Sequence, residues 1–472
     1  MIGNATSRIE CDGIGPLELG KDVVFGIQTQ RAVDLYPLVG QKCFAERPAL
    51  LNAMLAVKKA SAQTNVQIGV LDPAVGAAIE QAAAKLLSEP RPDFFPVHAA
   101  HGGGGISFNM NLNEVLANLA NAALTGAAYG TYAPVEPSDH VNLNHSTADS
   151  LSTACHIAAR TAYASFECEV AGLVEDLEAL VAEWGGQRKL ARTCMQDAVD
   201  ISFGDYLGGV SASLAFNLDR ARRDAEKLRA VSLGATIIGR REDCDPAFYT
   251  SILPALNAEL ERIGMPSGFR RANNLFAATQ AHDRLLALGG ALDQLGRTLM
   301  RFAKDLRLMA SGPVGGLSEI RLPAVQAGSS AIPGKVNPTI PEFMVQCAMI
   351  AAGHAHTMAM TQDHGELDYN PWQAVVIGSL LDMLSILESG VATLRRHCVQ
   401  GMVPDAARNN DLATSLLPSL ICLKQLKGYS YASRVAKDAA GDVDAVRREV
   451  ADAECACSSS HENTQYAENH HD

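Results

Sequence analysis

The chain has 472 residues, of which 47% are apolar and 19% are charged, and its formal net charge at pH 7 is −13. This acidic balance argues against nucleic acid or an anionic membrane as a partner. No stretch approaches about eighteen consecutive apolar residues, and residues 1–15 contain no apolar core of a signal peptide, so we expect a cytoplasmic protein without a membrane span.

Two further features of the composition bear on the state of the protein. The 11 cysteines include no C-x-x-C pair, which indicates free thiols in a reducing compartment. The charged fraction lies below the usual value of about a quarter, which indicates that part of the surface is buried in an oligomer. A chain of this length can form two or three domains or one elongated helical body.

Along the chain, residues before about 145 mix loops with shorter helices, among them 50–68 and 113–124. The segment 146–400 carries long series of apolar residues that alternate spacings of three and four. Such series predict long helices that pack at small crossing angles. Three of them are unbroken: 163–184, 285–309 and 380–398.

Few segments alternate with period two, so the sequence predicts an all-α protein, with a long central helix bundle flanked by two smaller, mainly helical domains. After residue 400, Pro404, Pro418 and Gly428 divide the chain into short helices, and the run from Ala453 onward is polar. We predict a mixed loop and helix domain at 1–145, a helix bundle at 146–400, a small helical domain at 401–452 and a disordered tail at 453–472.

The run from Gly328 to Pro338, G-S-S-A-I-P-G-K-V-N-P, is the most informative stretch for function. It combines hydroxyls, the Lys335 ammonium and the Asn337 amide between flexible glycines. This combination suits removal of a proton beside a carboxylate, because the cation and the amide can stabilise the charge that develops. The prolines limit helix formation and the glycines supply hinges for a closing lid. The alternative is a solvated surface loop rich in glycine and serine.

The same run closely resembles the signature loop of the aspartase/fumarase superfamily, G-S-S-x-M-P-x-K-x-N, with Ile332 where that pattern usually has Met. Further blocks of the superfamily occur in order over almost the whole chain. The segment 102–118, GGGGISFNMNLNEVLAN, is very similar to the corresponding stretch of aspartases. The chain is therefore identified as a member of this superfamily, closest to aspartate ammonia-lyase. The other matching blocks are 8–10, 26–32, 139–149, 191–198, 233–239 and 310–320.

The resemblance implies a homotetramer in which three subunits contribute to each active site, and a small dicarboxylate as substrate. It makes Ser329 the general base, and it implies no cofactor because protein donors hold the enediolate. The chain also retains Glu342, which is matched to the carboxylate that usually partners a histidine in this family. The resemblance also implies a set of residues that bind substrate or line the pocket: Ser107, Asn109, Ser146, Thr147, Thr193, Lys335 and Asn337.

Several positions depart from the family pattern. Cys194 replaces the family histidine, Ala148 an asparagine and Ile106 a threonine. Each lost contact to a carboxylate costs about 1.5–3 kcal/mol. A thiol beside Arg192 can have a lowered pKa, so Cys194 is a candidate proton donor. Replacement groups are also present: the cations of Arg240 and Arg241 and the imidazoles of His101 and His145.

We therefore expect Arg240, Arg241 and His145 to contact substrate in a changed pocket. The alternative is that the arginines form a solvated loop face and the histidines are ordinary surface residues. His98, His101, His145 and Cys194 are of the types that bind zinc, but they match no fixed metal motif, and we predict no metal.

The leading hypothesis is a carbon–nitrogen lyase that performs anti β-elimination on an aspartate or succinate-type substrate and gives fumarate or a relative. The alternatives are a fumarase-type hydratase and a lyase for an N-substituted or nitro-substituted succinate. A catalytically silent structural homologue is the alternative from another class. Loss of the pocket polar groups favours it, whereas the intact set formed by Ser329, Lys335, Asn337 and Glu342 argues against it.

Overall fold

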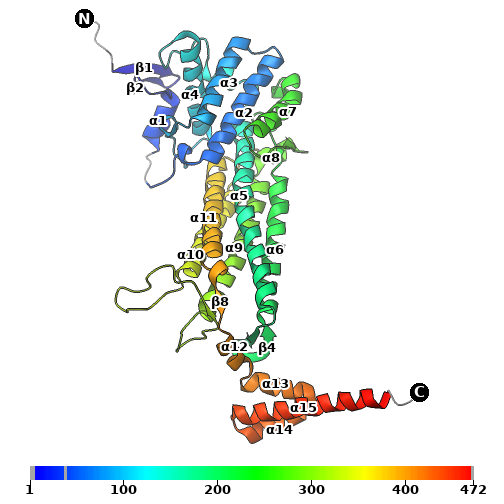
Figure 1. Ribbon diagram of the computed structural model, residues 1–472. Coiled ribbons are helices and arrows are strands. Elements are labelled where there is room, and N and C mark those ends of the chain that lie inside the picture. Colours follow the sequence, from blue (N-terminus) through cyan, green and yellow to red (C-terminus); the bar gives the residue numbers. More distant parts are fainter. Residues whose placement is uncertain (1–5, 37–39, 469–472) are drawn as a thin grey trace. The chain divides into compact units, whose positions relative to one another are not determined.

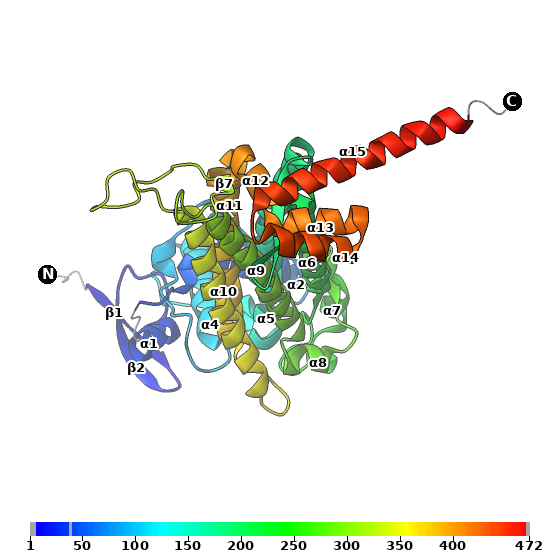
Figure 2. The same cartoon turned by 90° about the horizontal axis from the view of Figure 1, so that it is seen from below.

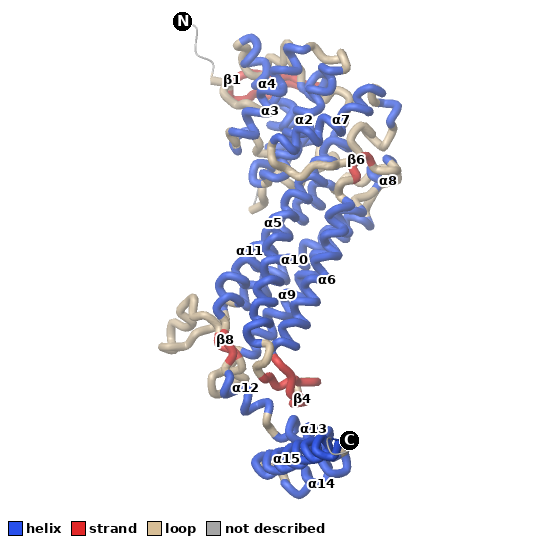
Figure 3. Tube along the Cα trace, turned by 45° about the vertical axis from the view of Figure 1, so that its right-hand side comes forward, coloured by secondary structure: helices blue, strands red, loops and turns tan. Residues whose placement is uncertain are grey.

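The structure is a computed structural model that describes residues 6–36 and 40–468. Helices dominate it, and in the described residues strands occur only as four two-stranded sheets. Figure 3 shows these short strands in red among the blue helices. The predicted all-α class is confirmed. Between residues 147 and 397 lie five helices of 25 residues or more: α5 (Thr147–Trp184), α6 (Phe203–Lys227), α9 (Asp283–Met309), α10 (Thr339–Asp363) and α11 (Gln373–His397).

The predicted seams lie on these long helices (Figure 1). The residues of the predicted seams are buried: Leu285, Leu288, Leu292, Leu295, Leu299, Phe302, Leu306 and Met309 of α9, and Leu380, Leu384, Leu387, Val391 and Leu394 of α11 with Cys398 directly after it. Burial of one continuous apolar stripe is what holds a long helix in a bundle, because propensity alone is a weak term. The segment Gln373–Gly401 is long and apolar enough to cross a membrane, but 67% of its most apolar window is buried inside the protein, as in a core helix.

Contacts divide the chain into two compact units. The first comprises 1–169, 217–297 and 347–389, and the second comprises 170–216, 298–346 and 390–472. Because the boundary crosses the long helices, these units do not follow the predicted limits at 145 and 400, and the four-part division remains a prediction.

The first unit contains a hairpin of antiparallel strands at its N-terminal end, followed by short helices and segments of the long ones. Helix α4 covers the predicted helical range 113–124, and α2 corresponds to the predicted range 50–68, ending one residue before its limit. Proline at the first turn and an aspartate N-cap start α3 and α7. The bounds are β1 Ser7–Asp12, β2 Gly15–Gly20, α1 Ile27–Leu35, α2 Pro48–Gln67, α3 Pro73–Ser88, α4 Ile106–Thr125, β5 Ala230–Val231, α7 Pro246–Arg262, β6 Arg270–Arg271 and α8 Leu275–Gln280.

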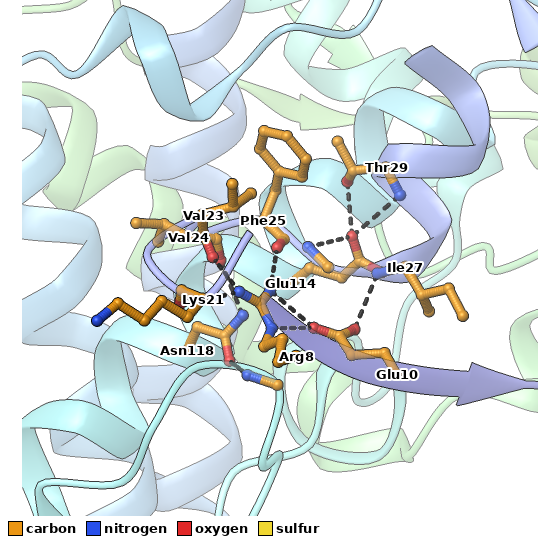
Figure 4. A network of polar contacts seen from close by, with 12 residues as sticks. Arg8, Glu10, Lys21, Val23, Val24, Phe25, Ile27, Thr29, Glu114 and Asn118 are labelled. Atoms are coloured by element: carbon orange, nitrogen blue, oxygen red, sulfur yellow. Dashed lines mark hydrogen bonds and ion pairs between the residues drawn. The ribbon is translucent and has the colours of Figure 1, made fainter. Parts of the chain in front are cut away.

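A buried polar network fixes the start of α1 against α4 (Figure 4). The Glu114 carboxylate of α4 accepts hydrogen bonds from the backbone N–H groups of Gly26, Gln28 and Thr29 and from the Thr29 hydroxyl, at 2.6–3.1 Å. Burial raises the pKa of Glu114 to about 7, and these donors act in the opposite direction. The network joins the start of α1 to α4, and α4 carries the predicted site residues Ser107 and Asn109 near its N-terminus.

The second unit contains a hairpin, β3 and β4, and a C-terminal group of helices. Helices α13, α14 and α15 pack together, as Figure 2 shows, around Leu423, Val435 and Val446. The bounds are β3 Arg188–Thr193, β4 Gln196–Ser202, β7 Ile320–Arg321, β8 Val403–Pro404, α12 Ala406–Ala413, α13 Leu416–Lys427, α14 Tyr429–Ala439 and α15 Val443–Glu468.

The predicted disordered tail differs from the structure. Helix α15 continues from Val443 through the predicted boundary at 453 as far as Glu468. Ala453 is buried in the C-terminal core, and the following residues include alanine and glutamate, which favour helix. Residues 469–472 of the predicted tail lie outside the described residues.

Candidate active site

Ser146 and Thr147 begin helix α5, and the Ser146 hydroxyl is fully engaged there. Its oxygen accepts a hydrogen bond from the Ala148 N–H at 3.1 Å and donates to the Thr236 carbonyl at 2.8 Å. The Asp149 carboxylate accepts in return from the Ser146 N–H at 2.8 Å, so side chains satisfy backbone N–H groups on both sides of this helix start. Among the described residues, the Thr147 hydroxyl has no hydrogen-bond partner, so Thr147 is the hydroxyl available to a ligand at this helix N-terminus.

Asp149 also ties the loop around residue 236 to the start of α5. Its second oxygen accepts from the backbone N–H groups of Gly234 and Thr236 at 2.9 and 3.0 Å. Burial raises the pKa of Asp149 to about 6, while these backbone donors act to lower it. The result is that Ile237 and Ile238 lie beside Thr147.

These residues enclose a hollow of about 460 Å³, which we call the Thr147 hollow. Residues from four separate parts of the chain meet there, three of which are blocks that the sequence singled out. Gly104, at φ +65°, leaves room for Tyr369, whose hydroxyl would lie 2.7 Å from a Cβ at that position. The Tyr369 hydroxyl donates to the Gly104 carbonyl at 3.1 Å. The lining is Gly103, Gly104, Ile106, Ser146, Thr147, Ala148, Ile237, Ile238 and Tyr369.

Ser107 and Asn109 do not line the Thr147 hollow. Ser107 lies in a second hollow, of about 420 Å³, with residues from the end of β1, the β1–β2 turn, α1 and the first turns of α4. Asn109 is 1% exposed and donates from Nδ2 to Asn142 Oδ1 at 3.0 Å. Ile106 lines both hollows, since it lies at the first turn of α4.

His145 is buried beneath the start of α5, and its ring faces Lys58. The Nδ1–H donates to the Leu143 carbonyl at 2.9 Å, so Nε2 is the acceptor that lies 2.8 Å from Lys58 Nζ. Lys58 also donates to Asn142 Oδ1 at 2.9 Å. Burial lowers the pKa of Lys58 to about 7 and holds the pKa of His145 well below its ordinary value. We do not propose substrate contact for His145, because its polar atoms serve these internal bonds.

The other candidate cations and imidazoles also have local partners. Arg240 forms an ion pair with Asp243 at 3.3 Å, and the Arg241 guanidinium lies 5.2 Å from the centre of the Tyr249 ring. His101 hydrogen-bonds the His98 carbonyl through Nδ1 at 2.7 Å. None of these side chains lines the Thr147 hollow, and their predicted or alternative roles remain untested. In the described residues, no group of three or more His, Cys, Asp or Glu could hold a metal ion.

The signature loop belongs to the second unit and is closed on itself. The Gly328 N–H donates to the Lys335 carbonyl at 3.1 Å, and Asn337 Nδ2 donates to the Gly328 carbonyl at 2.5 Å. Ser329 Oγ accepts from the N–H groups of Ala331 and Ile332 at 3.2 and 3.0 Å. Among the described residues, the exposed Lys335 ammonium has no ion-pair partner. The loop therefore presents a serine oxygen that receives two donors, together with an available cation.

Thr193 and Cys194 lie at the tip of the β3–β4 hairpin. Thr193 pairs with Gln196, and Cys194 and Met195 between them have φ values of +52° and +63°. Two positive φ values make a type I′ turn, which usually contains Asn or Gly. Arg192, next to this turn, donates to the fully buried Glu319 at 2.7 Å. The exposed Cys194 thiol is thus held at a constrained hairpin tip.

Glu342 lies in the first turn of α10 and forms an ion pair with Arg307 at 3.1 Å. Each unit therefore carries part of the predicted constellation. The first unit contains Ser107, Asn109, His145, Ser146, Thr147, Arg240 and Arg241; the second contains Thr193, Cys194, Ser329, Lys335, Asn337 and Glu342.

Sequence reasoning missed the apolar part of the Thr147 hollow and the buried partner of His145. Tyr369 lies in the segment between α10 and α11 and matches no motif, and Ile237 lies between matched residues without standing out. One feature of the sequence could have indicated Lys58, which lies within an apolar helical stretch. A lysine there is seldom fully buried unless it has a polar partner, so a buried polar contact could have been predicted for it.

Comparisons with known proteins agree with this fold. A family model described as Lyase matches residues 15–353. A class II fumarate hydratase of Pseudomonas aeruginosa is 36% identical, covering 92% of each chain, and an aspartate ammonia-lyase of a Bacillus species is 34% identical, covering 92% of this chain and 91% of that one. The crystal structure of a fumarate lyase:delta crystallin from Brucella melitensis aligns with a TM-score of 0.89 at 33% identity, covering 95% of this chain and 96% of that one.

The matching family model and these relatives identify the chain as a member of the lyases. More specifically, the chain belongs to the aspartase/fumarase superfamily.

Proposed function

We propose that the protein is a carbon–nitrogen lyase that eliminates an amine or ammonia from an aspartate or succinate-type dicarboxylate by anti β-elimination. The observation that carries this proposal is the environment of Ser329 Oγ, which accepts two backbone N–H hydrogen bonds. Donors to the deprotonated oxygen stabilise it, and a serine alkoxide is a base strong enough to take a proton beside a carboxylate.

Lys335 and Asn337 complete the reacting loop in this proposal. The Lys335 ammonium stabilises the aci-carboxylate that forms when Ser329 removes the proton. Asn337 uses one amide N–H to close the loop on Gly328, and its second N–H remains to bind a carboxylate. The Thr147 hydroxyl at the positive end of α5 offers a further carboxylate site. Elimination then breaks the C–N bond, and the electron pair departs with nitrogen.

Thr193, at the tip of the β3–β4 hairpin, supplies the second hydroxyl that binds a substrate carboxylate. Next to it, the exposed Cys194 thiol is the candidate that protonates the departing nitrogen. Glu342 would support proton transfer once released from Arg307, to which it is paired at 3.1 Å. No cofactor takes part in these steps.

A fumarase-type hydratase is the second candidate. It is favoured by the 36% identity to a class II fumarate hydratase, against 34% to an aspartate ammonia-lyase. Against it, the segment 102–118 resembles aspartases very closely, which supports nitrogen as the leaving atom.

We further propose a homotetramer in which three subunits contribute to each active site. Helix α10 supports an oligomer, because several of its large apolar side chains are exposed in the single chain: Phe343, Met349, Ile350 and Met360. A buried position for this face in an assembly would also explain the low charged fraction of the chain.

The proposal is tested by measuring the absorbance of fumarate while the protein is incubated with a panel of substituted succinates. The panel contains amino, N-alkyl, nitro and hydroxy compounds. Fumarate from the amino or N-alkyl compounds supports the carbon–nitrogen lyase, and fumarate from malate alone supports the hydratase. Elimination from the nitro compound alone would identify the nitrosuccinate lyase. If no compound is converted, the chain is a catalytically silent homologue.

A further inference from the structure

The Thr147 hollow is apolar beyond its one available hydroxyl. Its larger side chains are Ile106, Ile237, Ile238 and Tyr369. The Tyr369 hydroxyl is already engaged, since it donates to the Gly104 carbonyl at 3.1 Å and lies 3.3 Å from Gln373 Nε2. The Ser146 hydroxyl is engaged by Thr236 and Ala148. The lining of the hollow therefore presents an apolar surface to any ligand group that extends past Thr147.

The isoleucines of this wall are accessible in the chain. Ile106 is 40% exposed and Ile237 is 61% exposed, which is high for side chains of their size. No acidic residue belongs to the lining of this hollow, so it contains no partner for an ammonium group. An apolar group that covered the two isoleucines would remove their surface from water.

The lining of the hollow continues past the Thr147 hydroxyl. A carboxylate bound at that hydroxyl would lie beside Ile106 and Ile237, which belong to the same lining. A substituent on such a ligand would therefore meet apolar side chains.

We propose that the substrate is a succinate with an apolar substituent of several carbon atoms, and that the Thr147 hollow binds this substituent. This inference rests on the proposed function. In the reaction, a C–H proton passes to Ser329 and the C–N bond breaks with its electron pair on nitrogen. The substituent leaves with the amine if it is attached to nitrogen, and remains on the alkene if it is attached to carbon.

Binding of unreactive analogues tests the hollow without turnover. Calorimetry compares succinate with 2-butylsuccinate for the wild-type protein, for Ile106→Thr and Ile237→Ser, and for the control Val70→Ser, which changes an exposed apolar residue outside the hollow. A buried methylene strengthens binding about fourfold. We expect the butyl group to lower Kd about tenfold or more, and we expect the two hollow variants, but not the control, to lose most of this gain.

Turnover then separates the two points of attachment. N-butylaspartate and 3-butylaspartate are compared with aspartate by kcat/KM, and the preferred isomer identifies the position of the substituent. A Kd for 2-butylsuccinate no lower than that for succinate would overturn the inference. The inference would also be overturned if the butyl group lowered Kd as much in Ile106→Thr and Ile237→Ser as in the wild-type protein. If the butyl group strengthens binding but no nitrogen compound is eliminated, the hollow is upheld and the proposed lyase function fails.

Discussion

Lys58 Nζ lies 2.8 Å from His145 Nε2, and both side chains are buried beneath the first turn of α5. Because His145 Nδ1 donates to the Leu143 carbonyl, the lysine must supply the hydrogen of this contact while it is protonated. The pair thus supports the backbone that precedes Ser146 and Thr147, and its charge state connects the stability of this region to pH.

Stability should rise with pH between about 7 and 10.5 through Lys58. Its pKa is lowered from 10.5 to about 7 in the folded protein, so the unfolded chain binds more protons in this window. Thermal unfolding across these pH values should show the advantage of the wild type over Lys58→Met growing as pH rises. The exposed Lys85→Met is the control and should keep the wild-type slope. A wild-type advantage over Lys58→Met that stays constant across the window would contradict the lowered pKa.

Replacement of Ser329 by alanine should lower kcat by a factor of about 10² or more, because a positioned base typically contributes 10²–10⁴. The melting temperature should change little, since Ser329 is only partly buried, lies in a loop that is exposed over residues 330–336, and supports no core. Steady-state kinetics and thermal unfolding give the two readouts. The neighbouring Ser330→Ala is the matched control and should retain most activity. Retention of more than about a tenth of wild-type kcat by Ser329→Ala would remove Ser329 as the base.

Replacement of Lys335 by methionine should abolish turnover and weaken the binding of succinate, because the loop loses its available cation. A hydrogen bond to a charged group contributes about 1.5–3 kcal/mol, which is about tenfold to a hundredfold in Kd. Titration of the variant with succinate provides the measurement, and Lys335→Arg serves as the control that keeps the charge. Unchanged affinity in Lys335→Met would show that Lys335 does not bind a carboxylate.

The paired change Cys194→His and Ala148→Asn should shift preference toward unsubstituted aspartate or malate. Ala148 lines the Thr147 hollow, so asparagine adds an amide donor there, and histidine at 194 restores an imidazole at the hairpin tip. The ratio of kcat/KM for aspartate to that for a butyl-substituted aspartate is the readout. Efficient use of aspartate by the native enzyme, combined with loss of it in the double variant, would exclude a specificity change.

The long helices could be predicted from the sequence because their signal is periodic and local. The series from Leu285 to Met309 contains its own evidence for a buried stripe, and α9 buries it. The polar composition after Ala453 was misleading, since α15 continues through it to Glu468. A polar composition indicates that a segment forms no core of its own, but it does not exclude a helix that continues from a packed one.

The chemistry of the signature loop was also predictable, because Ser329, Lys335 and Asn337 are neighbours in sequence. The Thr147 hollow was not, since it joins residues near 104, 147, 237 and 369 that only the fold brings together. His145 illustrates the same limit: its residue type suggests a ligand contact, but the fully buried Lys58, far away in sequence, determines which way its ring faces.

Addition of ammonia or an alkylamine to fumarate in heavy water, followed by proton NMR, distinguishes a carbon–nitrogen lyase from a hydratase in a single sample. We expect an amino-dicarboxylate with a single deuterium at C3, anti to nitrogen, and we expect Ser329→Ala to form it about a hundredfold more slowly or less. Exclusive formation of malate in the same sample, or no product with the wild-type protein, would contradict the assignment of a carbon–nitrogen lyase.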